Sequence, residues 1–344
     1  MLLAIESSCD ESALALFERG VGLRGEWISS QVSLHAEYGG VVPDLASREH
    51  LNNFAPLLEA ARKDVGFEGI TEIAVTTGPG LAACLAMGLA VANALSLAWK
   101  VPVFGVNHLR AHAHSPFLPV YEDCPERFDT LLVDELLPHL SLIVSGGNTI
   151  LARIEKDRSL SILGQTIDDA AGEALDKGAK LLALGYPGGP KLEQLADGSD
   201  VKAYQFPRGL VGKPHLDFSF SGLKTSLRYQ VEKMGPEAAA ADIGNLCASY
   251  QEAVVDALIR KSDKALKGGG YKSMGLSGGV SNNGVLRARF EALGTKRRVK
   301  SLLARRCHTG DNAGMIGFSH VFEKRVRQDG MLDIAPSLQL DATV

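Results

Sequence analysis

One pattern constrains the fold of this 344-residue chain more than any other: an apolar run, a bend of small polar residues, and a second apolar run. It occurs at 2–17 (LLAIESSCDESALALF) and 140–154 (LSLIVSGGNTILARI), and a related SGG bend at 277–279 leads from a strand-like run into a helical one. Glycine and serine at such bends leave backbone N–H groups uncovered, where they can bind an anion. Plain β-hairpins contain these bends too. Because the pattern occurs three times, we expect two facing lobes with a nucleotide between them.

The remaining sequence alternates strand-like runs with helical stretches, which predicts an α/β fold with sheets covered on both faces. With 45% hydrophobic and 22% charged residues, the composition is that of a globular protein, and the length suits two domains. The five scattered cysteines include no C-x-x-C pair, which indicates a reducing compartment. The first residues, MLLAIESSCDES, lack the basic start of a signal peptide. We therefore expect a cytoplasmic protein.

Residues 81–99 (LAACLAMGLAVANALSLAW) carry no formal charge and are long enough to cross a membrane. They lie between two strand-like runs, at 73–77 and 101–106. This placement favours a helix of a strand-helix-strand unit, which is apolar all round because both of its sides are buried. We expect no membrane association.

Charge is unevenly distributed along the chain. The whole chain has a net charge of −4, but residues 257–306 contain 13 lysines and arginines and only two acidic residues. This +11 segment is either a solvated helix face or a surface that faces a polyanion. If it faces a polyanion, reversing Arg297 and Arg298 to glutamate should weaken binding of that polyanion.

Known phosphate-binding motifs are absent or incomplete. No G-x-x-x-x-G-K-[ST] occurs, and residues 221–225 (SGLKT) only echo it. Residues 78–83 match G-x-G-x-x-A, but the following strand ends without the acidic residue that a dinucleotide site requires, so we expect no Rossmann cofactor. After the third bend, Asn282 or Asn283 is expected to cap a helix, whose positive end also favours phosphate.

Residues 166–185 (TIDDAAGEALDKGAKLLALG) predict a helix with a capping box in which Thr166 reaches toward Asp169. Asp169, Glu173 and Asp176 then share one face. That face is either solvated or the source of a carboxylate that binds a ribose. The turn at 186–190 (YPGGP) follows, and its glycines permit close approach of the backbone to a ligand.

Three histidines occur within NHLRAHAHS, at 107–115. His108 and His112 are four residues apart, so on a helix capped by Asn107 they share a face and can bind one metal, whereas His114 points elsewhere. A third ligand must come from a distant segment, and Asp311 lies in a glycine-flanked turn. Two imidazoles and a carboxylate suit Fe(II) or Zn(II). Histidines at this spacing are also common as packing or surface residues.

Eight segments in register carry a resemblance that covers nearly the whole chain. They are ESSCDES (6–12), HAEYGGVVPDLASREH (35–50), NHLRAH (107–112), SGGNT (145–149), DDAAGEALDKGAKLLALGYPGGP (168–190), FSFSGLKT (218–225), GGVSNN (278–283) and GDNAGMI (310–316). Together they resemble the bacterial tRNA N6-adenosine threonylcarbamoyltransferase family. The chain departs from the family at Asn148, where histidine is frequent, and segment 120–137 matches no motif; we expect an acidic surface loop with a short helix there.

The resemblance implies an actin, sugar-kinase and Hsp70-like (ASKHA) fold with two lobes, each built on a mixed sheet with flanking helices. We place the N-terminal lobe at 1–118 plus 318–344 and the C-terminal lobe, with the nucleotide-binding elements, at 119–317. The implied reaction transfers the threonylcarbamoyl group of threonylcarbamoyl-AMP to N6 of adenosine 37 in tRNAs that read ANN codons. Implied partners are the tRNA anticodon loop, a smaller paralogous subunit, a P-loop ATPase and a separate enzyme that supplies the adenylate.

The resemblance also implies roles for individual residues. One divalent metal, Fe(II) with Zn(II) as the alternative, would be bound by His108, His112 and Asp311. The adenylate would be bound by Ile143, Val144, Ser145, Gly146, Gly147, Asp176, Gly189 and Asn283. Glu11 would act in acid/base chemistry or in substrate positioning. Alternative functions are a metalloprotease, which lacks its general base because Leu109 occupies that position, a sugar or acid kinase of the same fold, and a non-catalytic binding partner.

Overall fold

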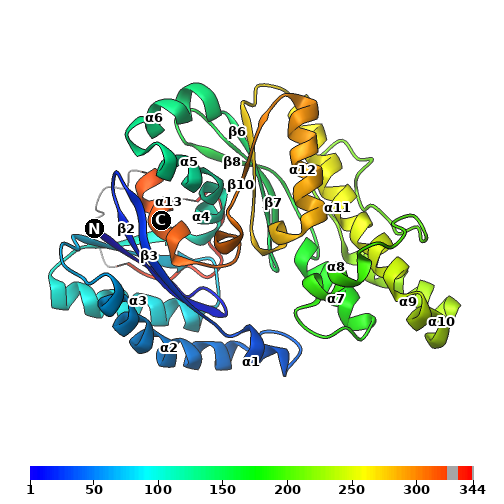
Figure 1. Cartoon of the computed structure of the whole chain (residues 1–344), viewed down its shortest axis with the longest axis horizontal. Helices are drawn as coiled ribbons and strands as arrows, with labels where there is room; N and C mark the ends of the chain where they lie inside the picture. The colour runs from blue at the N-terminus through cyan, green and yellow to red at the C-terminus, as the bar shows by residue number, and fades with distance from the viewer. Residues whose placement is uncertain (324–331, 343–344) are drawn as a thin grey trace. The chain divides into compact units, whose positions relative to one another are not determined.

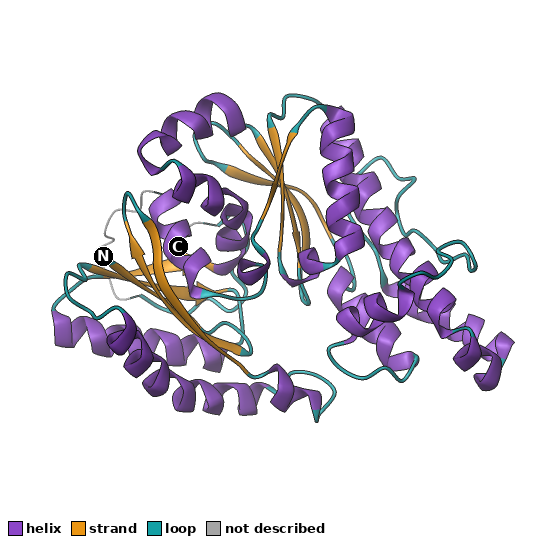
Figure 2. Ribbon diagram, in the orientation of Figure 1, coloured by secondary structure: helices purple, strands orange, loops and turns teal. Residues whose placement is uncertain are grey.

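The computed structural model describes residues 1–323 and 332–342. The chain divides into two compact units: unit 1 is Met1–Asp134 with Ala304–Val344, and unit 2 is Glu135–Leu303. Each unit contains one five-stranded sheet with helices against it (Figures 1 and 2). The lobe boundaries expected from the sequence placed 119–134 and 304–317 in the second lobe, whereas the structure groups both segments with unit 1.

The sheet of unit 1 has the strand order β3-β2-β1-β4-β5. Its strands are β1 (Leu2–Glu6), β2 (Glu11–Glu18), β3 (Gly22–Ser30), β4 (Glu72–Gly78) and β5 (Val103–Asn107). β1 pairs antiparallel with β2 and parallel with β4; β2 and β3 are antiparallel, and β4 and β5 are parallel. The first repeated segment thus forms the β1–β2 hairpin. Both strands are buried along nearly their whole length because helices pack against the sheet.

The helices of unit 1 pack in two groups. They are α1 (Val32–Ala36), α2 (Pro43–Asp64), α3 (Ala82–Trp99), α4 (His108–His114), α5 (Leu118–Asp123), α6 (Phe128–Leu131) and α13 (Ala313–Phe322), with short helical turns at Ser115–Phe117, Pro125–Arg127, Leu132–Leu136 and Arg306–His308. α2 and α3 lie side by side, while α13 contacts α4, β1 and β2 (Figure 1). Segment 120–137 is largely helical rather than a loop, and buried Tyr121 accepts a hydrogen bond from Gly20 N at 2.7 Å.

Unit 2 has the same sheet topology as unit 1. Its strands are β6 (His139–Val144), β7 (Thr149–Ile154), β8 (Leu160–Gln165), β9 (Ser273–Ser277) and β10 (Lys300–Leu303), in the order β10-β9-β6-β7-β8. β6 pairs antiparallel with β7 and parallel with β9, as β1 does with β2 and β4. The second repeated segment is therefore the equivalent hairpin of unit 2, and the predicted repeat of strand, bend and strand is confirmed.

The helices of unit 2 are α7 (Ala171–Leu181), α8 (Gly188–Ala196), α9 (Ser221–Met234), α10 (Pro236–Ala241), α11 (Ile243–Lys267) and α12 (Gly284–Arg297), with a short turn at Gly279–Asn282 between β9 and α12. Two of them, α11 and α12, pack against the sheet. The third SGG bend leads from β9 into this turn and then into α12. Asn283 caps α12, because its Oδ1 accepts a hydrogen bond from Leu286 N at 2.9 Å, as predicted.

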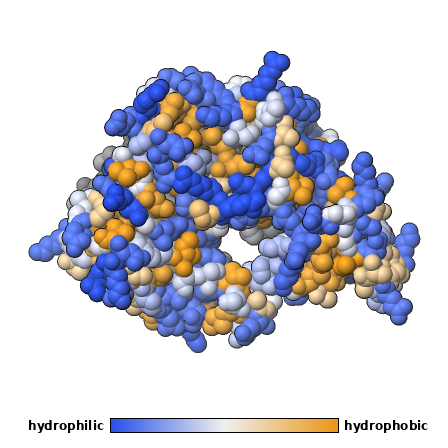
Figure 3. All heavy atoms as spheres, viewed as in Figure 1, coloured by the Kyte–Doolittle hydropathy of each residue, from blue (hydrophilic) through white to orange (hydrophobic). Residues whose placement is uncertain are grey.

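The apolar helix α3 is not covered all round, so that prediction is wrong. Its buried residues are Cys84, Leu85, Gly88, Leu89 and Ala92, and they form one stripe toward the sheet. On the opposite side, Leu97 is 81% exposed. Among the described residues, α3 is the one helix long and apolar enough to cross a membrane by length and composition. On the face drawn in Figure 3, hydrophobic residues form scattered patches among hydrophilic ones.

The predicted capping box at Thr166 is also wrong. α7 begins at Ala171, not at Thr166, because β8 continues to Gln165 and Thr166 then bridges to Phe218. The Thr166 hydroxyl donates to Asp169 O instead of capping a helix. The first turn of α7 is capped from another element, since Thr149 Oγ1 accepts a hydrogen bond from Ala171 N at 2.8 Å. The SGGNT bend and α7 are therefore joined by this bond.

Candidate functional site

Helix α4 brings two histidines onto one buried face. Asn107, at the end of β5, caps the helix: its Oδ1 accepts hydrogen bonds from Leu109 N at 3.0 Å and Arg110 N at 3.2 Å. His108 and His112 follow one turn apart, with ring centroids separated by 4.7 Å and ring planes at 90°. Both side chains are buried. His114 is directed elsewhere, as expected, and its ring stacks on Phe322.

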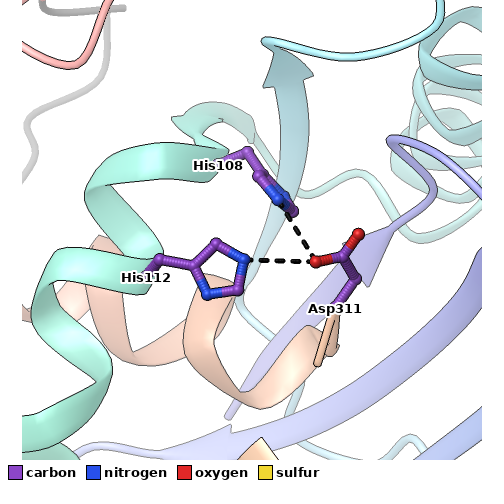
Figure 4. A group of neighbouring side chains, drawn as sticks. All are labelled: His108, His112 and Asp311. Carbon is purple, nitrogen blue, oxygen red and sulfur yellow. Dashed lines mark hydrogen bonds and ion pairs between the residues drawn. The ribbon is translucent and has the colours of Figure 1, made fainter. Parts of the chain in front are cut away.

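Asp311 completes a group of three candidate ligands (Figure 4). It precedes α13, whose start is fixed by Asn312, because Asn312 Oδ1 accepts a hydrogen bond from Met315 N at 2.8 Å. Asp311 Oδ1 lies 3.1 Å from His112 Nε2 and 3.4 Å from His108 Nε2. One ligand atom from each residue lies within 4.8 Å of the others. The structure thus brings together the three residues that the sequence proposed as ligands.

This donor set fits a divalent cation. Two imidazole nitrogens and a carboxylate oxygen are ligands for Fe(II) and Zn(II), and three protein ligands leave coordination positions for a substrate. Burial alone would raise the pKa of Asp311, but the charges and hydrogen bonds of His108 and His112 hold it well below its usual range. The carboxylate is therefore ionised, as a metal ligand must be.

The pKa values of the two histidines shift in opposite directions. Burial disfavours the charged form of both rings. For His108, the negative charges of Asp311 and Glu6 outweigh burial and raise the pKa well above its usual value. For His112, burial prevails over the hydrogen bond to Asp311, so the pKa is lowered. Because a metal displaces the proton from a ligating imidazole, acid should release the metal.

Glu6 belongs to the same cluster, although it was not among the residues predicted from the sequence. This buried carboxylate ends β1, and its Oε2 lies 3.1 Å from His108 Nδ1. Burial favours its neutral form, but the charge and hydrogen bond of His108 lower its pKa. A charged residue at the end of an otherwise apolar strand, in LLAIE, was the signal that could have identified it.

Glu11, the proposed acid/base residue, begins β2 across the same bend. Burial and the negative charges of Asp311 and Asp10 raise the pKa of Glu11 to about 9. The Ser30 hydroxyl donates a hydrogen bond to Glu11 Oε1 at 3.0 Å. Burial and the neighbouring negative charges both favour the protonated acid, which can donate a hydrogen bond.

The candidate nucleotide-binding residues all lie in unit 2 and begin at the end of β6. Ile143 and Val144 are buried strand residues, and the bend at 145–147 follows them. A Cβ atom on Gly146 or Gly147 would meet no atom within 4 Å, so the bend faces open space. Its other side contacts α7, because Gly172 N donates a hydrogen bond to Ser145 O at 3.2 Å.

Asp176 and Gly189 are joined by hydrogen bonds. Asp176 Oδ1 accepts from Gly188 N at 2.8 Å and from Gly189 N at 3.3 Å, so the turn at 186–190 fixes the carboxylate. Asp169 and Glu173 instead pair with Lys177 at 2.7 and 2.9 Å. Of the predicted acidic face, only Asp176 is thus held by the glycine turn.

Asn283 has a structural role that limits what it can offer a ligand. Its Oδ1 caps α12, and its Nδ2 donates to Gln251 Oε1 at 2.7 Å. An amide nitrogen has two hydrogens, so one N–H remains for a ligand. The contact with Gln251 fixes the direction of that N–H.

Two units with one shared mixed-sheet topology, together with a His-His-Asp cluster, define an ASKHA-fold protein with a candidate metal centre. The fold is shared with two solved HypF structures, one in a phosphate- and nucleotide-bound form (TM-score 0.61, 14% identity) and one from T. kodakarensis (0.59, 14%). These alignments cover 94% and 92% of this chain, which spans 46% of each HypF chain. Component A of the Acidaminococcus fermentans (R)-2-hydroxyglutaryl-CoA dehydratase is also similar, with a TM-score of 0.50, 14% identity, and coverage of 94% of this chain and 99% of that one.

Sequence comparison identifies the family. Residues 22–318 match the model of the TsaD family, tRNA N6-adenosine threonylcarbamoyltransferase. A protein of that name from Anaeromyxobacter dehalogenans (strain 2CP-C) is 43% identical over 347 residues, covering 98% of this chain and 99% of the relative. The chain belongs to the tRNA N6-adenosine threonylcarbamoyltransferase family. It is a transferase that acts in tRNA modification. The family therefore favours the predicted transferase over the protease and kinase alternatives.

Proposed function

We propose that this chain transfers the threonylcarbamoyl group from threonylcarbamoyl-AMP to N6 of adenosine 37 in tRNAs that read ANN codons. In this reaction the N6 amine attacks the carbamoyl carbonyl carbon, the bond from that carbon to the phosphate oxygen breaks, AMP leaves, and the amine loses a proton. The target base lies in a single-stranded loop, where N6 is accessible without opening a duplex. The observation that carries the proposal is the convergence of His108, His112 and Asp311 in a chain of this family.

The three residues would hold one divalent cation, for which family resemblance favours Fe(II) and leaves Zn(II) as the alternative. When bound, such a cation supplies Lewis-acid polarisation of a carbonyl or phosphoryl oxygen. The chain supplies a rigid frame for it: α4 carries both imidazoles and is capped by Asn107, while Asn312 fixes the turn that carries Asp311. A frame of this kind keeps the ligands in place as the substrate exchanges.

Glu11 would position the substrate as a hydrogen-bond donor. A carboxylate only accepts hydrogen bonds, whereas the protonated acid also donates one. Burial and the negative charges of Asp311 and Asp10 raise the pKa of Glu11, which favours its protonated form. The developing negative charge on the carbonyl and phosphate oxygens of the donor is the kind of charge that such a group stabilises.

Unit 2 would bind the AMP part of the donor. The open bend presents the backbone N–H groups of Gly146 and Gly147, which suit a phosphate, and Asp176 presents a carboxylate suited to ribose hydroxyls. Asn283 adds one N–H. The metal cluster itself lies in unit 1.

The tRNA surface would use only part of the +11 segment. Many of its cations already have partners: Arg260 and Arg289 pair with Asp256, Arg297 and Lys267 with Asp263, and Arg305 with Glu122, while Lys261 is buried. Lys296, Arg298 and Lys300 are exposed and form no ion pair within the part of the chain that the structure describes. They follow one another at the end of α12 and the start of β10, and we propose that they contact tRNA phosphates.

Arg297 is therefore a poor test of this surface, because reversing it would place a glutamate beside Asp263. Lys296→Glu with Lys300→Glu is the better variant. Losing two phosphate contacts should weaken tRNA binding and reduce the slope of log K against log salt by about 2. Lys100→Glu with Lys202→Glu, at two exposed lysines that form no ion pair with any described residue, makes the same change in net charge and should leave both quantities unaltered. Equal effects of the two double variants would contradict the assignment.

The exposed side of α3 would be a surface for a partner protein. We propose that it binds the smaller paralogous subunit implied by family resemblance, because an exposed helix side made mostly of alanines, with Leu97 in the last turn, is suited to packing against a similar face. A P-loop ATPase and an enzyme that supplies the adenylate remain proposed partners. The cytoplasm remains the expected compartment, since tRNA is the substrate.

The function is tested by combining the purified chain with tRNA, synthetic threonylcarbamoyl-AMP, the paralogue and the ATPase, and detecting the modified nucleoside by mass spectrometry. His108→Ala should abolish product formation. His215→Ala, which changes a partly exposed histidine outside the cluster, should not. Product formed equally by the His108 variant would refute the proposed role of the cluster.

A further inference from the structure

Glu6 has no role in the function described so far. It is fully buried at the end of β1, where a charged side chain is costly unless it has partners. Its Oε2 lies 3.1 Å from His108 Nδ1, and the Ser8 hydroxyl lies 3.2 Å from the same nitrogen. Glu6 therefore contacts the side of the His108 ring that faces away from Asp311.

The Glu6 carboxylate is itself held in place by the sheet. The Thr76 hydroxyl donates a hydrogen bond to Oε2, and Ser8 N donates one to Oε1 at 2.5 Å. Thr76 belongs to β4, which pairs directly with β1. The position of the carboxylate is thus set by the central strands of unit 1, not by the helix that carries His108.

A fixed carboxylate decides which nitrogen of His108 carries the proton. A neutral imidazole has one N–H, and an ionised carboxylate only accepts hydrogen bonds. With Glu6 at Nδ1, the hydrogen belongs on Nδ1 and the lone pair on Nε2, the nitrogen that lies 3.4 Å from Asp311 Oδ1. Ligating histidines typically donate their other N–H to such an acceptor.

His112 provides a contrast on the same helix. Its Nε2 also faces Asp311, at 3.1 Å, but its buried Nδ1 has no hydrogen-bond partner among the described residues. One imidazole of the pair is therefore oriented by a carboxylate and the other by packing. The simpler alternative is that Glu6 only stabilises the bend at 7–10.

We propose that Glu6 is a positioning residue for His108, which accepts the Nδ1 hydrogen and so holds the Nε2 lone pair toward the metal position. This inference rests on the proposed metal site. It predicts an effect on metal affinity and on the tautomer of His108, neither of which should change if Glu6 only stabilises the bend.

The first test compares Glu6→Gln with Ser7→Ala. The glutamine amide has one oxygen, so it cannot accept from His108, Thr76 and Ser8 N in the same arrangement. Zn(II) affinity, measured by competition with a chelator, should fall 10–100-fold, the usual effect of removing such a partner. Ser7, whose hydroxyl donates to Cys84 O, lies beside Glu6 without contacting His108, so its variant should stay within about twofold of wild type. Unchanged affinity in Glu6→Gln would overturn the proposal.

The second test needs no variant at position 6. In the Zn(II)-loaded wild-type protein, ¹⁵N NMR of the imidazoles should show His108 protonated at Nδ1, with its signals identified by their loss in His108→Asn. Protonation at Nε2 instead would overturn the proposal even if Glu6→Gln failed to fold. A wild-type protein that binds no Zn(II) or Fe(II) would refute the metal site itself, whereas metal binding with the wrong tautomer would refute only the role of Glu6.

Discussion

Replacing Gly172 with alanine tests whether α7 supports the bend at 145–147. A Cβ atom at this position would lie 2.5 Å from Ser145 O and 2.8 Å from Gly146 Cα. Both are backbone atoms that cannot rotate away, so the bend or the helix must shift by several tenths of an ångström. The hydrogen bond from Gly172 N to Ser145 O, now 3.2 Å, would be strained by the same shift.

The expected change in the free energy of unfolding is the difference between two effects of the added methyl group. Forcing a methyl group into a packed contact costs about 1–3 kcal/mol, whereas alanine gains up to about 1 kcal/mol over glycine within a helix. We therefore expect Gly172→Ala to lower the free energy of unfolding by about 1–2 kcal/mol in urea titrations. AMP binding, measured by calorimetry, should weaken about tenfold or more because the phosphate donors are displaced.

Gly222 provides the matched control. It is the second residue of α9, as Gly172 is of α7, but a Cβ atom there would meet nothing within 4 Å. Gly222→Ala should raise stability by about 0.5–1 kcal/mol and leave AMP affinity unchanged. A Gly172 variant as stable as Gly222→Ala, with wild-type affinity for AMP, would refute the reasoning.

Three further predictions concern unit 1. Hydrogen bonds from His320 and Arg19 lower the pKa of Glu72 from an ordinary 4.5 to about 2. The ionised Glu72 therefore stabilises the fold above pH 4.5, and this contribution is lost as the pH falls toward 2. Glu72→Gln should cost about 1–3 kcal/mol at pH 7 and flatten the acid side of the stability profile in urea titrations. Deleting residues 332–344 removes the two backbone carbonyls to which Asn107 Nδ2 donates hydrogen bonds, at 2.8 and 3.3 Å. Because each bond stabilises the fold by about 1 kcal/mol, both Tm and Zn(II) affinity should fall. Gln339→Ala keeps the backbone carbonyl of residue 339 and should change neither. Leu97→Asp should abolish binding of the paralogue in pull-down and calorimetry without lowering the Tm of the isolated chain, and retained binding would contradict a contact through α3.

Sequence patterns identified some residues of the metal cluster and missed others. The spacing of His108 and His112 was informative because helical periodicity acts over four residues, and Asn107 identified the start of the helix. Asp311 was proposed from its glycine-flanked turn and again from the family resemblance, because no local rule connects it to residues two hundred positions earlier. Glu6 was missed altogether, because its contact with His108 depends on the pairing of β1 with β4.

The errors have physical causes that differ from case to case. Thr166 matched a capping box, but pairing with Phe218 kept the chain extended, so the cap came from Thr149 on another strand. The composition of α3 indicated burial on all sides, but composition does not state what covers each side of a helix. Its exposed side, around Leu97, was visible only once the neighbouring elements were placed.

The sequence by itself determined the two equivalent hairpins, the cap at Asn107 and the family, and it limited the cap of α12 to Asn282 or Asn283. These features depend on periodicity and on hydrogen bonds between residues close in the chain, or on a match along its whole length. Only the tertiary structure decided which cationic side chains are free of ion pairs with described residues, and which atoms orient the histidines. Arg297 and Lys300 look alike in the sequence, yet one pairs with Asp263 and the other is exposed, because pairing depends on what lies opposite a side chain in the folded protein.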